Sequence, residues 1–294
     1  MRCCSAQKTC LQTSKPYSTS GCIASASLGS IARAIDTRVA PYWNLGAAAA
    51  IMPCMRALLA TAALSPLLIA QALYVRRVTP RLPEPDGERS GADGAGPLLR
   101  VLIAGDSAAA GVGVDAQAAA LSGCLVEELV RDHRVQWRLI ARSGYTIAQL
   151  IDVLEQHAPE PFDVAAVSIG VNDVLGLTRL NDWQQRTRRL VSLLAARFAV
   201  RRVLLCAVPP LQGFPALPQP LAWALGRRAA RLNATSHRAL RDDAHGRVVQ
   251  PTFALEHSAL ASDGFHPGAA AYRLIARDLA NTIRADHALS NCRN

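Results

Sequence analysis

From residue 98 onward, the apolar residues of this chain follow two alternating patterns. Five short runs are apolar on successive residues, as in VLIA and DVAAVSIG, which is typical of strands buried on both faces. These runs cover residues 98–104, 135–141, 163–170, 201–208 and 247–250. Stretches with one apolar face at helical spacing lie near residues 116–132, 147–157, 179–198, 220–240 and 268–285. The alternation predicts an α/β fold, a three-layer α/β/α sandwich with a five-stranded parallel sheet.

Residues 1–54 differ in composition from the rest of the chain. They contain both of the lysines and five of the eight cysteines, and they show no sustained helical or strand periodicity. We therefore expect a disordered or untranslated extension, with Met52 or Met55 as the true start.

An apolar run over residues 57–75 is the next distinct feature. With its basic flanks it outlines a secretory signal peptide or an N-terminal membrane anchor over residues 55–77. Residues 70–72 match a small-x-small cleavage pattern, whereas the three arginines within residues 76–81 favour keeping the following domain in the cytoplasm. We expect a membrane-anchored or exported protein that associates with the membrane through 57–75. A buried core helix is the alternative reading of this run.

The remaining boundaries follow from changes in composition. Residues 78–97 combine proline, glycine and charge with little apolar content, which predicts a flexible linker. One domain then covers residues 98–285, and residues 286–294 form a C-terminal tail.

Charge and cysteine content exclude several classes of protein. The net charge is +10, but the basic excess is spread along the chain and is not concentrated on one arm, so we expect no nucleic-acid partner. Cys124 and Cys206 lie within apolar patterns and are interpreted as buried thiols. The cysteines and histidines do not have zinc-site spacing, so no metal is expected.

Polar residues stand in three turns beside predicted elements, where a ligand would bind. The segments are Gly105-Asp106-Ser107 after the first strand, Gly170-Val171-Asn172-Asp173 after the third, and Asp263 to His266 before the last helix. In parallel α/β sheets, ligands bind at the carboxyl ends of the strands. A serine, an imidazole with a nearby carboxylate and an amide at one edge are the groups that acyl transfer requires.

These segments resemble the SGNH hydrolases, also called GDSL esterases and lipases. GDS follows the first strand, Gly144 follows the second within ARSGYT, GxND follows the third, and DxxH precedes the last helix. The resemblance covers about residues 98–285, with all four blocks in order. Ala108 stands where the family usually has leucine, and the second block lacks the asparagine often seen before its glycine.

The resemblance implies a role for each matching residue. Ser107 would be the nucleophile, His266 the general base and Asp263 its orienting carboxylate. The backbone N–H groups of Ser107 and Gly144 and the side-chain amide of Asn172 would form the oxyanion hole. It also implies a sheet of flavodoxin-like strand order and hydrolysis of a small-molecule or lipid carboxylic ester, of the esterase, lipase or deacetylase type, through an acyl-enzyme and without a cofactor.

Two other functions are weighed against this one. Residues 111–116 fit the GxGxxA pattern of dinucleotide-binding proteins, but GDSAAA intervenes after the strand and no acidic residue ends the second strand. A membrane-tethered binding module of the same fold, without turnover, is the other alternative. The segment 209–223 is expected to overhang the site and to offer an apolar wall for an acyl group.

Overall fold

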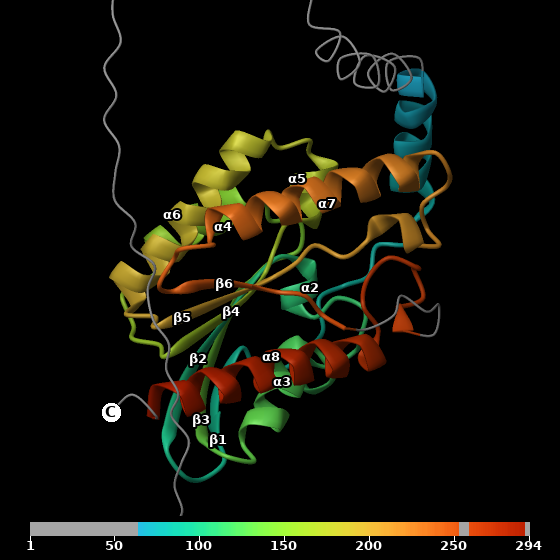
Figure 1. Ribbon diagram of the computed structural model, residues 1–294. Helices are drawn as coiled ribbons and strands as arrows, with labels where there is room; N and C mark the ends of the chain where they lie inside the picture. The colour runs from blue at the N-terminus through green and yellow to red at the C-terminus, as the bar shows by residue number, and fades with distance from the viewer. Residues whose placement is uncertain (1–63, 253–258, 292–294) are drawn as a thin grey trace, which may run out of the picture. The chain divides into compact units, whose positions relative to one another are not determined.

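The computed structural model describes residues 64–252 and 259–291 (Figure 1). The predicted extension over residues 1–54 lies outside the described residues. So does the first part of the predicted signal peptide or anchor, residues 55–63.

The centre of the molecule is a six-stranded sheet with the order β1-β3-β2-β4-β5-β6. The strands are β1 (Ser90–Asp93), β2 (Leu98–Gly105), β3 (Arg134–Ala141), β4 (Val164–Ser168), β5 (Arg202–Cys206) and β6 (Gly246–Val249). β2 to β6 are mutually parallel and β1 is antiparallel to β3. The five parallel strands have the 2-1-3-4-5 order of flavodoxin-like folds, as expected. The prediction of five strands in all was wrong, because β1 adds a sixth.

Helices cover both faces of the sheet (Figure 1). They are α2 (Ser107–Ala110), α3 (Leu121–Leu129), α4 (Ile147–Gln156), α5 (Val171–Leu175), α6 (Leu180–Phe198), α7 (Leu221–Ala239) and α8 (Ala269–Asn291), with 3₁₀ turns at Gln117–Ala119 and Leu211–Gly213. α4, α6 and α7 pack on one face, and α3 and α8 pack on the other. Successive residues of β2 pack on opposite faces of the sheet. Leu102 joins the core under α4, α6 and α7, and Ile103 joins the core under α3 and α8. The three-layer prediction is confirmed.

The predicted linker, residues 78–97, is folded against the domain in part. Ser90 to Asp93 pair with Arg138 to Val135 of β3, and the Leu139 N–H donates to the Arg89 carbonyl at 2.7 Å. The sequence SGAD gives no strand signal, because all four residues are exposed and the strand is held by backbone hydrogen bonds. The flexible-linker prediction is therefore wrong for this stretch. The predicted tail also differs, since α8 continues to Asn291.

A helix over residues 64–78 precedes the sheet. Leu68 and Val75 pack against the core, and the Gln71 side chain donates to the Gln219 carbonyl at 2.6 Å and accepts from the Leu221 N–H at 3.1 Å. Within residues 64–252 and 259–291, no helix combines the length and apolar character needed to cross a membrane.

Candidate active site

A sharp turn at the end of β2 presents Ser107. Gly105 has φ +149°, and a Cβ there would lie 1.8 Å from the Ser168 carbonyl oxygen, so only glycine fits this approach of β2 to β4. The Asp106 N–H donates to that carbonyl at 2.9 Å. The Asp106 side chain then accepts from the Ala108 N–H at 3.1 Å and caps α2. Asp106 is therefore the N-cap, and Ser107 is the first residue of the helix.

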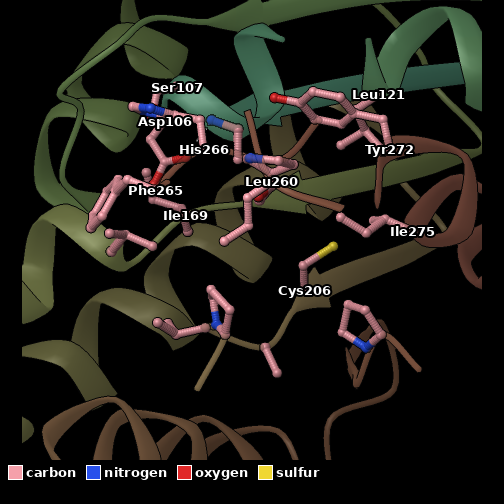
Figure 2. A pocket seen from close by; sticks show the side chains of 18 of the residues that line it. Asp106, Ser107, Leu121, Ile169, Cys206, Leu260, Phe265, His266, Tyr272 and Ile275 are labelled. Atoms are coloured by element: carbon pink, nitrogen blue, oxygen red, sulfur yellow. Dashed lines mark hydrogen bonds between the residues drawn. The ribbon is translucent and has the colours of Figure 1, made fainter. Parts of the chain in front are cut away.

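The loop before α8 holds His266 against Ser107. His266 Nε2 lies 3.0 Å from Ser107 Oγ, and Nδ1 lies 2.6 Å from Asp263 Oδ2 (Figure 2 labels Ser107 and His266). The other Asp263 oxygen accepts from the backbone N–H groups of Phe265 and His266 at 2.9 and 3.0 Å. Because an ionised carboxylate can only accept, Nδ1 carries a proton and Nε2 can accept the serine proton.

The surroundings of Asp263 keep it ionised. Burial of its side chain raises the pKa of the carboxyl, but the hydrogen bonds from the His266 ring and from two backbone N–H groups outweigh burial and hold the pKa below its ordinary value. The buried Asp263 carboxylate is therefore negatively charged, and it faces the half-buried imidazole of His266.

Side-chain hydrogen bonds join the second sequence block, residues 141–146, to the turn after β4. Asn172 donates through Nδ2 to the Tyr145 carbonyl at 2.9 Å. Asp173 is fully buried and accepts from the Ile147 N–H at 2.9 Å. These contacts hold Asn172 beside the loop that contains Gly144. One hydrogen of the Asn172 amide is used by Tyr145, and its NH₂ group has a second.

Gly144 adopts φ +90°, in the region that favours glycine. A Cβ at this position would meet nothing within 4 Å. Glycine is therefore required here by the backbone conformation, not by crowding.

Glu84 supports the same loop from the segment predicted as a linker. Its Oε1 accepts from the Ser143 N–H at 2.7 Å, and its Oε2 pairs with Arg89 at 3.2 Å. The Arg89 guanidinium also donates to the Ala141 carbonyl. No sequence pattern indicates this contact, because it joins residues 59 positions apart.

A pocket of about 140 Å³ opens beside the serine and the histidine (Figure 2). Its walls come from the carboxyl ends of β4 and β5, the segment after β6, the loop before α8, and the first residues of α3 and α8. Of the apolar residues expected to form an acyl wall within 209–223, only Phe214 lines it, joined by Pro209 and Pro210. Leu211, Leu217 and Leu221 are buried in the core instead, and Trp223 is exposed beside Arg227.

Two buried acidic groups border the pocket. Burial raises the pKa of Asp106 to about 7, and its Oδ2 is buried without a hydrogen-bond partner in the structure. Burial likewise raises the pKa of the Cys206 thiol to about 12, so this thiol is neutral. Cys124 and Cys206 are both buried and free, as the sequence predicted.

The glycines of the weaker dinucleotide-binding pattern have a different role. Gly111 ends α2 in a left-handed conformation, and α2 separates it from β2. The turn between strand and helix that this pattern requires is therefore not formed here.

Comparisons with known proteins agree with the order of the sequence blocks. The GDSL-like lipase/acylhydrolase family matches residues 103–274, a range that contains all four blocks. Over 244 residues the chain is 30% identical to the GDSL-like esterase Rv1075c of Mycobacterium tuberculosis, covering 74% of this chain and 76% of that protein.

Solved structures similar to this chain include two esterases. An acetylxylan esterase from Geobacillus stearothermophilus is 18% identical with a TM-score of 0.49, covering 64% of this chain and 94% of that one. The esterase EstA from a Pseudoalteromonas species is 19% identical with a TM-score of 0.47, covering 63% and 97%.

Proposed function

The chain belongs to the GDSL-like lipase/acylhydrolase family and is an ester hydrolase, and we propose that it cleaves carboxylic esters through a Ser107, His266 and Asp263 triad. The observation that carries this proposal is the pair of contacts made by the His266 ring, 3.0 Å to Ser107 Oγ and 2.6 Å to Asp263.

The first half of the reaction forms an acyl-enzyme. Ser107 Oγ attacks the ester carbonyl while His266 Nε2 takes the hydroxyl proton. The C–O bond to the alcohol then breaks, and the imidazolium returns the proton to the leaving oxygen. Asp263 orients the ring and stabilises its charged form. In the second half, water repeats the sequence on the acyl-enzyme and releases the carboxylic acid.

The negative charge that develops on the carbonyl oxygen needs donors. We assign this role to the backbone N–H groups of Ser107 and Gly144 and to the free amide hydrogen of Asn172. The bonds from Asn172 to Tyr145 and from Ile147 to Asp173 support this assignment, because they fix the donors before substrate binds.

The test is hydrolysis of p-nitrophenyl butyrate by Ser107→Ala. We expect kcat to fall by at least about a thousandfold with the thermal unfolding midpoint retained, because only the nucleophile is lost. Ser192→Ala, an exposed serine on α6, is the matched control and keeps full activity. Full activity in Ser107→Ala would refute the triad. A wild-type protein that binds esters without turnover would support the binding-module alternative instead.

We also propose that residues 57–75 hold the protein at a membrane, as an anchor or during export. One face of the helix over residues 64–78 packs on the domain, yet large apolar side chains remain exposed around the rest of it. These are Leu67, Ile69, Leu73, Tyr74 and Val78. No acidic residue precedes Glu84 in this part of the chain, and Arg76, Arg77 and Arg81 suit anionic headgroups.

Vesicle flotation tests this second proposal. We expect the full chain to float with vesicles of phosphatidylcholine and phosphatidylglycerol, and Ile69→Ser with Leu73→Ser to weaken binding by at least about tenfold. Leu177→Ser removes an apolar side chain that is 66% exposed elsewhere and leaves binding unchanged. Equal binding of wild type and the double variant would contradict the proposal.

A further inference from the structure

The pocket beside Ser107 is lined by only one of the three residues assigned to the oxyanion hole, Ser107 itself. Gly144 and Asn172 are not among its lining residues, whereas Ser107 and His266 are. Figure 2 shows Ser107 and His266 on one side of the pocket and Cys206 and Ile275 on the other. In the tetrahedral intermediate on Ser107, one substituent can therefore enter the pocket while the oxyanion points toward Gly144 and Asn172.

The side of the pocket away from Ser107 is apolar. Leu121 and Ile275 present hydrocarbon, and Cys206 presents a neutral thiol. The Tyr272 hydroxyl, which also lines the pocket, already donates to the Val112 carbonyl at 2.7 Å. Beside Leu121, Cys206 and Ile275, a polar alcohol or a sugar would lose hydrogen bonds to water, whereas a hydrocarbon chain would not.

Besides Ser107 Oγ, the tetrahedral carbon carries three substituents, and the site must accommodate each of them. The oxyanion lies toward Gly144 and Asn172. The leaving alcohol receives a proton from His266 Nε2 and must return to water. The acyl chain needs neither a proton nor solvent, and the apolar interior is the place that suits it.

Resting on the proposed ester hydrolysis, we propose that this pocket binds the acyl chain and selects chains of about four to six carbons, with Ile275 limiting its length at the end away from Ser107. The size follows from volume. An apolar protein cavity of about 150 Å³ holds benzene, a six-carbon molecule, and this pocket has about 140 Å³. Long fatty-acyl chains exceed it, and an acetyl group leaves most of it empty.

Ile275 has a natural control beside it. It lies on α8 with 9% of its surface exposed and faces the pocket, whereas Leu274 is 37% exposed and does not line it. The experiment measures kcat/KM for p-nitrophenyl esters from acetate to dodecanoate in wild type, Ile275→Phe, Ile275→Ala, Leu274→Phe and Leu274→Ala.

Wild type is expected to prefer butyrate and hexanoate over acetate and dodecanoate by about tenfold. Ile275→Phe lowers kcat/KM for hexanoate by at least about tenfold while acetate changes less than about threefold. Ile275→Ala moves the optimum toward octanoate, a gain that misfolding cannot produce. Both Leu274 variants keep the wild-type profile.

Three outcomes would overturn the acyl assignment. They are a flat chain-length profile, equal losses on all esters in both Ile275 variants, and a profile that moves as much in the Leu274 variants. A change confined to the alcohol, seen by comparing ethyl with benzyl butyrate, would assign the pocket to the leaving group. Because each of these requires Ser107-dependent turnover, they are distinct from failure of the proposed triad, in which Ser107→Ala stays active.

Discussion

The Glu84 carboxylate accepts a hydrogen bond of 2.7 Å from the backbone N–H of Ser143, the residue before Gly144. The contact reaches the proposed oxyanion hole from outside the five parallel strands. Glu84 is itself held by Arg89, whose carbonyl bonds to β3 next to the strand β1. The segment before the first parallel strand thus braces the loop on which the Gly144 N–H depends.

We expect Glu84→Ala to lower kcat by about five- to tenfold with little change in KM, because a misplaced donor acts on the transition state more than on bound substrate. Glu84→Gln keeps an acceptor oxygen and restores part of the loss. Glu88→Ala removes an exposed carboxylate four residues away and serves as control. Stopped-flow or steady-state assays on a soluble ester give both constants. Equal loss in the Gln and Ala variants would assign Glu84 to stability alone.

Asn172→Ala removes the proposed side-chain donor. We expect kcat to fall by about a hundredfold or more with KM nearly unchanged, since the amide acts mainly on the oxyanion. Asn181→Ala, at an exposed position on α6, controls for loss of an amide. If the change appears in KM only, Asn172 binds substrate and is not part of the hole.

The parallel sheet and the meeting of Ser107, His266 and Asp263 could be predicted from the sequence because each has a local signal. Runs such as VLIA mark strands buried on both faces, and Ser107, Asp263 and His266 stand in short motifs next to predicted elements. The assembled contacts agree in geometry with those motifs, although a catalytic role for them stays a proposal.

What the sequence could not predict depends on contacts between distant residues. β1 is short, exposed and held through its backbone, so its side chains carry no pattern. Glu84 lies in a stretch rich in proline and glycine that resembles a linker. Ile275 lies in the predicted last helix, but its place in the pocket depends on how α8 meets β5 and β6. Phe214 lines the pocket, whereas most other apolar residues of the segment 209–223 pack inward.

Asp106 makes stability depend on pH in a predictable direction. Its pKa is raised to about 7 by burial, so its ionised form is disfavoured in the fold, and its contribution to stability is lost as pH rises from its ordinary value through about 7. Asp106→Asn keeps the capping oxygen and cannot ionise. We expect its thermal unfolding midpoint to exceed that of wild type at about pH 8 by on the order of 5 °C, and the gain to shrink at about pH 4. A gain independent of pH would show that Asp106 does not titrate in this range.

Replacing His266 and replacing Asp263 are expected to change the pH dependence of activity in different ways. His266→Ala leaves Ser107 without a proton acceptor and is nearly inactive at every pH. Asp263→Asn keeps the ring but loses the carboxylate that fixes its tautomer, so we expect a large loss near neutral pH with partial recovery at alkaline pH. The pH profile of kcat/KM for both variants is the measurement. Wild-type activity of Asp263→Asn at neutral pH would mean that another group orients His266.

Covalent labelling of the nucleophile tests the central claim most directly. The full chain is treated with a fluorophosphonate, which reacts with activated serines, and the modified peptide is located by mass spectrometry. We predict one equivalent of adduct on Ser107, loss of ester hydrolysis in step with labelling, and no adduct in Ser107→Ala or His266→Ala. An adduct on another residue, or full labelling of Ser107 in protein that still hydrolyses esters, would contradict the account.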